Sequence, residues 1–397
     1  MFVKIANLLI AVGTVVVLTQ GCGSPARKEA VPAARTTQAV VPGLADVRYR
    51  VGIDNEAILR EGLASVRREQ AYLGASGKVT TLPPAAFLAV SGGGDDGAFG
   101  AGLLNGWTAA GTRPEFKLVT GISTGALIAP FAFLGPDYDG RLKDFYTNTS
   151  PSDIAEKRSI LAALTDDAMA DNKPLWNRVS KEVDRPLLDA IAREYEKGRL
   201  LLVATVDLDA RQAVLWNMTK IAASRHPKAL DLFRSIMIAS AAIPGAFPPV
   251  MIDVEANGHT YQEMHVDGGT MAQVFVYPPA LRLKELGRKN RFERERRAYV
   301  IRNSRIDPDW AQVDRRTMSI LGRAISSLIT TQGIGDLYRI YLTCQRDGVD
   351  YNLAYIPATF RAPHREEFDT EYMRTLYKTA YDMAAQGYPW AKTPPGY

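Results

Sequence analysis

The chain has 397 residues, of which 46% are hydrophobic and 23% are charged, the proportions of an ordinary globular protein. Its formal net charge of +5 is a small difference between 48 basic and 43 acidic residues, so composition does not indicate nucleic-acid binding and we expect no nucleic-acid partner. This length accommodates two average domains or one large α/β domain with insertions.

The first 21 residues have the pattern of a signal peptide. The apolar run over residues 5–18 is shorter than the roughly 20 residues that cross a bilayer, although an uncleaved membrane helix is the alternative. Small residues before Cys22 resemble the lipobox of bacterial lipoproteins, in which this cysteine becomes the lipidated first residue. We therefore expect a lipid-anchored protein of the bacterial cell envelope, on the periplasmic face of the outer membrane. Cys344 would then lack a partner for an intramolecular disulfide.

Composition and periodicity divide the remaining chain into four parts. Residues 22–48 mix Ala, Pro, Thr and Arg without periodicity, which predicts a flexible tether. Residues 49–84 form an N-terminal helical extension, because apolar residues recur at helical spacing over 55–73. Residues 85–280 hold the motifs discussed below, and residues 281–397 are expected to form a C-terminal extension packed on that core.

A glycine-rich turn separates a predicted strand from a predicted helix. Residues 85–90, "AAFLAV", are apolar throughout, as a strand buried on both faces requires. The turn "SGGGDDG" follows, then a helix over 98–110 and a second strand over 116–120. This order predicts a βαβ unit with the glycines at the strand-to-helix turn.

Three interpretations of the turn are possible. Gly92, Gly94 and Gly97 fit the G-x-G-x-x-G dinucleotide fingerprint, but the second strand lacks the acid that would hold a ribose. The glycines could serve only tight packing. They could also let backbone N–H groups converge on an anion at the positive end of a helix.

The next strand ends in "GISTG", residues 121–125, followed by a predicted helix over 126–134. The G-x-S-x-G pattern between a strand and a helix is typical of a nucleophile elbow, in which Gly121 and Gly125 keep Ser123 accessible. Acyl transfer needs a nucleophile and also donors for the developing oxyanion. The neighbouring turn is thus predicted to be an oxyanion hole formed by Gly92, Gly93 and Gly94.

The base for this serine has several candidates. Asp267 ends a predicted strand in "HVDGG" and is followed by two glycines, although an aspartate at this position can also be a simple turn residue. His265 would share its strand face and is the alternative base. His364 lies in the polar stretch "RAPHREEF", which favours a solvated surface position.

Five segments, "SGGGDDGAFGAGLL", "GISTG", "LLVATVDLDARQAVLW", "IMIASAAIPGAFPPV" and "HVDGG", make residues 85–280 resemble the patatin-like phospholipases. The resemblance implies a three-layer α/β/α fold with a mainly parallel sheet. It also implies a Ser/Asp dyad, with Ser123 as nucleophile and Asp267 as base, that hydrolyses lipid acyl esters without a metal or other cofactor. Many family members carry a basic residue where this chain has Asp95 and Asp96.

These observations together predict a phospholipase A-type serine hydrolase that acts on phospholipids or related lipid esters. Carboxylates beside an oxyanion would oppose the developing charge, so we expect Asp95 and Asp96 to point away from Ser123 or to pair with a cation. Residues 151–198 are a candidate lid over an acyl pocket. The alternatives are a non-catalytic lipid-binding envelope lipoprotein with the same fold and a hydrolase of soluble esters or thioesters.

Overall fold

The computed structural model describes residues 25–75, 82–157, 167–308 and 310–397. The predicted signal peptide and Cys22 lie outside these residues. None of the described helices is both long and apolar enough to cross a membrane.

A nine-stranded sheet forms the centre of the described structure, in the order β1-β7-β6-β3-β2-β10-β11, with β9 joined to β6 and β8 to β9. The five strands from β6 to β11 along this path are parallel, whereas β1, β7, β8 and β9 pair antiparallel with their neighbours. The strands are β1 Arg48–Arg50, β2 Ala85–Val90, β3 Phe116–Gly121, β6 Leu200–Asp207, β7 Gln212–Asn217, β8 Val250–Ala256, β9 His259–Asp267, β10 Arg296–Arg302 and β11 Asp350–Tyr355. A separate small pair joins β4 Glu156–Lys157 to β5 Ala170–Asp171.

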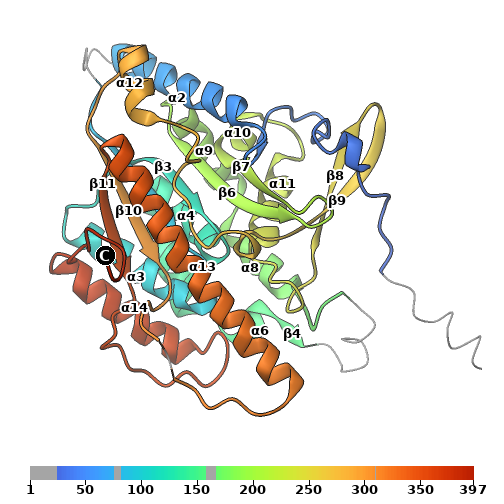
Figure 1. Ribbon diagram of the computed structural model, residues 1–397, viewed down its shortest axis with the longest axis vertical. Helices are drawn as coiled ribbons and strands as arrows, with labels where there is room; N and C mark the ends of the chain where they lie inside the picture. The colour runs from blue at the N-terminus through green and yellow to red at the C-terminus, as the bar shows by residue number, and fades with distance from the viewer. Residues whose placement is uncertain (1–24, 76–81, 158–166, 309) are drawn as a thin grey trace, which may run out of the picture.

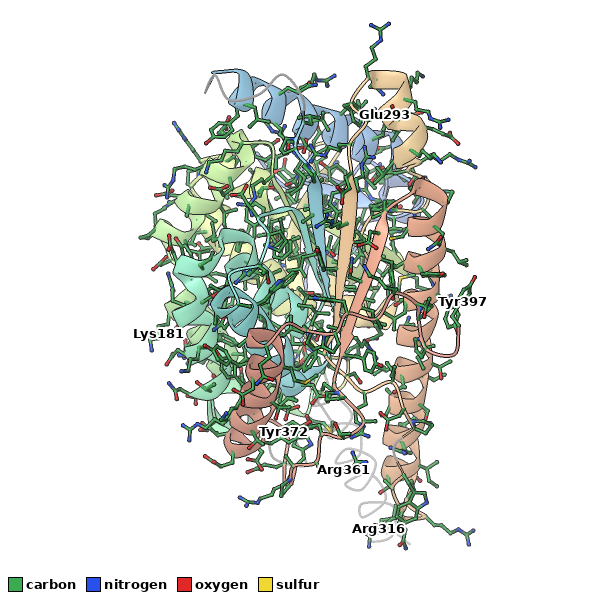
Figure 2. The ribbon with its side chains drawn as sticks, turned by 90° about the vertical axis from the view of Figure 1, so that its left-hand side faces the viewer. Lys181, Glu293, Arg316, Arg361, Tyr372 and Tyr397 are labelled. Atoms are coloured by element: carbon green, nitrogen blue, oxygen red, sulfur yellow. The ribbon has the colours of Figure 1, made fainter. Side chains whose placement is uncertain are left out.

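Helices cover both faces of the sheet, which gives the three-layer α/β/α fold that the sequence predicted (Figures 1 and 2). One face carries α3 Gly97–Ala109, α4 Thr124–Leu134, α5 Asp139–Thr147, α6 Pro151–Ile154, α8 Lys173–Glu182, α9 Arg185–Glu196, α10 Met218–Ala223, α11 Ala229–Ser240 and α14 Thr370–Ala385. The other face carries α2 Asn55–Ala75, α12 Leu283–Asn290 and α13 Thr317–Asp347. All six residues of β2 are buried because apolar cores lie on both of its faces.

The prediction of a flexible tether is wrong for residues 25–48. Val31, Val41 and Leu44 are buried in the main core, and Val40 forms a bridge with Glu255 of β8. Arg27 pairs with Asp209 at 2.7 Å. The Ala and Pro content of this segment is typical of a linker, but its few apolar side chains pack beside the β8–β9 hairpin.

The predicted boundaries at residues 84 and 280 do not separate structural units. The N-terminal extension contributes β1 to the central sheet, next to β7. The C-terminal extension contributes β10 and β11, and β10 pairs directly with β2. Both extensions therefore complete the sheet and are not merely packed on a finished core.

Candidate active site

The glycine turn and the GISTG segment lie side by side at the carboxyl ends of two parallel strands. In the register of β2 and β3, Val90 is opposite Gly121. The residues after each strand therefore meet, and a Cβ atom on Gly92 would lie 3.2 Å from the Cβ of Ser123. Carboxyl ends of parallel strands are the usual position of sites in α/β folds.

Ser123 occupies a sharp turn between β3 and α4. Its φ of 55° is in a region that side-chain-bearing residues rarely adopt, which is expected of a nucleophile elbow. A Cβ on Gly121 would lie 2.3 Å from the carbonyl oxygen of Gly125, and one on Gly125 would lie 2.2 Å from that of Val90. The turn therefore requires both glycines for space.

Ser240, at the end of α11, holds the backbone of this turn. The amide of Ser123 donates to Ser240 Oγ at 3.0 Å, and the Ser240 hydroxyl donates to the carbonyl of Ala204 at 2.7 Å. The sequence motifs did not identify this supporting role of Ser240. Its position in the "IMIASAAIPG" segment was the available signal.

Asp267, the last residue of β9, lies against Ser123. The Ser123 side chain is close enough to the carboxylate to lower its pKa. Asp267 Oδ1 also accepts from the amide of Gly269 at 2.7 Å, while the Asp267 amide donates to the carbonyl of Ala242 at 3.0 Å. Only 4% of the residue is exposed. Burial raises the pKa of Asp267 to about 7, against the opposing effects of the Ser123 side chain and of the bond from the Gly269 amide.

The glycine turn, next to Ser123, contains two amides that are not hydrogen-bonded within the described residues. Gly92 N donates to the carbonyl of Gln273, whereas the amides of Gly93 and Gly94 have no acceptor among the described residues. Gly93 and Gly94 have φ values of 155° and 59°, which favour glycine. Gly94 and Ser123 line the same small apolar pocket.

Asn303, directly after β10, fixes this turn from the C-terminal part of the chain. Its amide donates to Ser91 Oγ and its Nδ2 to the carbonyl of Ser91, both at 2.9 Å. Its Oδ1 accepts from the amide of Gly100 at 3.0 Å. A Cβ on Gly93 would lie 1.9 Å from the carbonyl oxygen of Asn303. This contact was absent from the sequence analysis because it joins segments about 200 residues apart.

Arg302 places a positive charge beside the glycine turn. It is the last residue of β10 and only 2% exposed, and a Cβ on Gly333 of α13 would lie 2.6 Å from its Cζ. Burial lowers the pKa of Arg302 to about 10, against the effects of Asp336 and Asp96, so the guanidinium stays protonated at neutral pH. Gly333 therefore supplies the space in which this cation lies.

Gln273 and Asp336 form the wall on the α13 side. Gln273 Nε2 donates to the carbonyl of Gly269 at 2.7 Å and to Gln332 Oε1 at 3.0 Å. Asp336 Oδ2 accepts from the amide of Gln273 at 2.6 Å. These bonds connect α13 to the segment that follows Asp267.

Neither candidate histidine is placed as a base for Ser123. His265 is fully buried, and its two ring nitrogens lie 2.8 Å from Thr205 Oγ1 and 3.0 Å from Glu263 Oε2. His364 Nε2 lies 2.7 Å from Asp95 Oδ2, so this histidine is not the free surface residue that the sequence suggested. Both rings belong to other networks.

The carboxylates of Asp95 and Asp96 face the C-terminal segment, as predicted. Asp95 also accepts from the amide of Phe368 at 2.9 Å. Asp96 accepts from the hydroxyl of Tyr372 at 2.5 Å, and Tyr372 stacks on His364 with ring centres 4.3 Å apart. Two acids that seemed incompatible with an oxyanion site are thus used to attach the start of α14 to the glycine turn.

The pocket beside Ser123 is lined by apolar residues from several elements, namely Leu127, Phe145, Ile154, Leu175, Phe247, Phe368 and Met373. Ile154 belongs to α6 and Leu175 to α8, both within the predicted lid region. Residues 158–166 of that region lie outside the described residues. In the described part of the chain, no cluster of three or more His, Cys, Asp or Glu side chains is placed to hold a metal ion.

Comparison with known families agrees with this arrangement. Residues 88–279 match the model of the patatin-like phospholipases. These residues form a patatin-like phospholipase domain. Ser123, Asp267 and the glycine turn all lie within the matched range of the patatin-like domain, whereas Asn303 and His364 lie beyond it. Patatin-like phospholipases are lipid hydrolases.

The comparison with curated protein sequences gave no match. Among solved structures, the crystal structure of VipD from Legionella pneumophila is similar to this chain, with a TM-score of 0.39 and 13% sequence identity. The alignment covers 77% of this chain and 66% of that chain, just under two thirds of its length.

Proposed function

We propose that this protein is a phospholipase A-type acyl hydrolase that uses Ser123 as its nucleophile and Asp267 as its base. The observation that carries the proposal is the position of Ser123, at a positive-φ turn, beside the buried carboxyl of Asp267, whose pKa the Ser123 side chain influences. The amides of Gly93 and Gly94, in the turn next to Ser123, have no acceptor among the described residues. Nucleophile, base and oxyanion donors are thus assembled from three strand ends.

In this mechanism Asp267 accepts the proton of the Ser123 hydroxyl while Oγ attacks the ester carbonyl. The carbonyl π electrons move onto oxygen, and the amides of Gly93 and Gly94 stabilise the resulting oxyanion. Collapse of this intermediate expels the alcohol, which takes the proton from Asp267, and leaves an acyl-serine. Water, deprotonated by Asp267, then attacks the acyl-serine. Collapse of this second intermediate breaks the bond to Ser123 Oγ, which takes the proton back from Asp267, and releases the fatty acid.

The raised pKa of Asp267 supports this assignment. An aspartate at its ordinary pKa of 3.8 is a weak base for a hydroxyl, whereas one with a pKa of about 7 is suited to proton transfer at neutral pH. The apolar pocket beside Ser123 favours an acyl chain as the substrate group.

The test is acyl release by the parent and by Ser123→Ala from two substrates, phosphatidylcholine vesicles and a short-chain nitrophenyl ester. We expect the parent to cleave both, and Ser123→Ala to lose at least about 10³-fold in turnover on each. Release that survives Ser123→Ala would refute the nucleophile. Cleavage of the short ester alone would favour a soluble-ester hydrolase, and cleavage of neither would favour a lipid-binding protein.

We also propose that Cys22 carries a lipid that anchors the protein in a bacterial envelope membrane, facing the periplasm. The small residues before this cysteine, after an apolar run, support the proposal. In cells supplied with labelled palmitate, the parent should become labelled and sediment with membranes. Cys22→Ser should take up no label, and equal labelling of the two proteins would contradict the anchor.

A further inference from the structure

The N-terminal half of α13 exposes a row of large apolar side chains to solvent. Ile320, Leu321, Ile325, Leu328 and Ile329 are 53%, 49%, 46%, 70% and 38% exposed, and we call these five residues the apolar face of α13. Single exposed apolar residues are common on protein surfaces, but a contiguous group of this kind marks an interaction site.

Polar side chains lie on the opposite side of this part of α13. At about 100° per residue, Ser319, Ser326 and Thr330 fall on the helix line that carries Leu337 and Cys344 further along. Leu337 and Cys344 are fully buried against the sheet. The apolar face of α13 therefore lies on the side of the helix opposite to Leu337 and Cys344, the residues with which it packs on the sheet.

Charge around the apolar face favours an anionic partner. Residues 315–335 include Arg315, Arg316 and Arg323 and contain no acidic residue. Trp310, shortly before the helix, is 88% exposed. Exposed leucines and isoleucines accompanied by arginine and tryptophan are the composition of helices that lie in the surface of anionic membranes.

The apolar face of α13 lies at the same end of the sheet as the candidate active site. Figure 2 shows the start of α13, marked by Arg316, extending beyond the end of the sheet at which β10 and β11 finish. Ser123 follows β3, which is parallel to those strands, so it lies at the same end. Just after the apolar face, Gln332 of α13 accepts a hydrogen bond from Gln273. This bond connects the helix to the residues beside Ser123.

We propose that the apolar face of α13 docks on the surface of an anionic phospholipid membrane, with the apolar side chains among the upper acyl chains and the arginines at the phosphates. Part of the reasoning depends on the proposed lipid hydrolase function, because an ester within a bilayer must reach Ser123, which is only 7% exposed. The docking itself does not require catalysis. It can therefore be measured in an inactive protein.

The test measures partitioning of the full chain onto vesicles of phosphatidylcholine with about one third phosphatidylglycerol, by co-sedimentation. The reference protein carries Cys22→Ser and Ser123→Ala, so that a lipid anchor and hydrolysis cannot contribute. Adding Ile325→Ser and Leu328→Ser should weaken partitioning by about 10- to 100-fold, because two inserted side chains are lost. Ser326→Ala, on the opposite side of the same turn, is the matched control and should partition like the reference.

Thermal unfolding of each variant verifies that the substitutions in α13, which are all at exposed positions, leave the fold intact. Equal partitioning of the reference and the double variant would overturn the proposal, as would an equal loss in Ser326→Ala. Self-association of the reference through this face, abolished in the double variant without any effect on vesicle binding, would assign the face to a second copy of the chain. If hydrolysis did not depend on Ser123, the proposed function would be refuted, but the result of the vesicle-binding experiment would still stand.

Discussion

Asp267→Asn should hydrolyse phospholipid and short-chain esters at least about 10³-fold more slowly than the parent, because asparagine cannot accept the Ser123 proton. The side chain remains close in shape, so it can still accept the hydrogen bond from Gly269. For the parent, kcat/KM should rise with pH and level off above about 7, as Asp267 becomes ionised. The residual kcat/KM of Asp267→Asn should not show this increase with pH.

The matched control is His364→Gln, which alters a histidine on the Asp95 side of the glycine turn. It should retain most of the turnover and the same pH profile. If His364→Gln abolished hydrolysis while Asp267→Asn preserved it, a histidine would be the base and the dyad would be incorrect.

Stability gives an independent measurement on Asp267→Asn. Burial raises the folded-state pKa of this carboxyl from 3.8 to about 7, so the neutral form is favoured in the folded state. The associated stability is complete below pH 3.8 and is lost as pH rises through about 7. A neutral asparagine does not incur this loss. In denaturant titrations, the variant should therefore gain stability relative to the parent, on the order of 2 kcal/mol, between pH 5 and pH 9.

Gly93→Ala should lower turnover by at least about 10²-fold, the usual effect of removing one oxyanion donor. The added Cβ would lie 1.9 Å from the carbonyl oxygen of Asn303, at a φ of 155°. Since the clash is with backbone, the turn itself must move, and its amides with it. We expect kcat to fall more than KM rises, because the oxyanion exists only after attack.

Gly140→Ala is the control for this substitution. Gly140 lies in α5, and a Cβ there would have open space around it, so activity should be unchanged. Steady-state kinetics and thermal unfolding of both variants separate a displaced turn from a general loss of stability. A Gly93→Ala protein with normal kcat would exclude the Gly93 amide as an oxyanion donor.

The strands and helices around the site were predictable because their signals are local. The strand over 85–90, the glycine turn and the elbow at Ser123 are all defined within about 40 residues of sequence. Helix α13 runs from Thr317 to Asp347, so Gly333 lies inside it. Glycine usually weakens a helix interior, but at this position it gives space to Arg302.

The supporting residues were not predictable because they act across long sequence separations. Asn303 and His364 contact the glycine turn from the C-terminal part of the chain, and neither belongs to a recognisable motif. Ser240 resembles any small helical residue until its bond to the Ser123 amide is seen. Sequence patterns thus indicated the proposed reacting groups, whereas the groups that hold them in place required the three-dimensional structure.

The position of β10 between β2 and β11 has a consequence for how the chain is made. During synthesis from the N-terminus, β2 and β3 leave the ribosome long before residues 296–302, the strand that must pair with β2. Until then β2 has an unpaired edge, and the side chains that later contact α13 are uncovered. The nascent protein therefore depends on late-arriving sequence, and chaperone protection of this edge would matter most during translation of its final third.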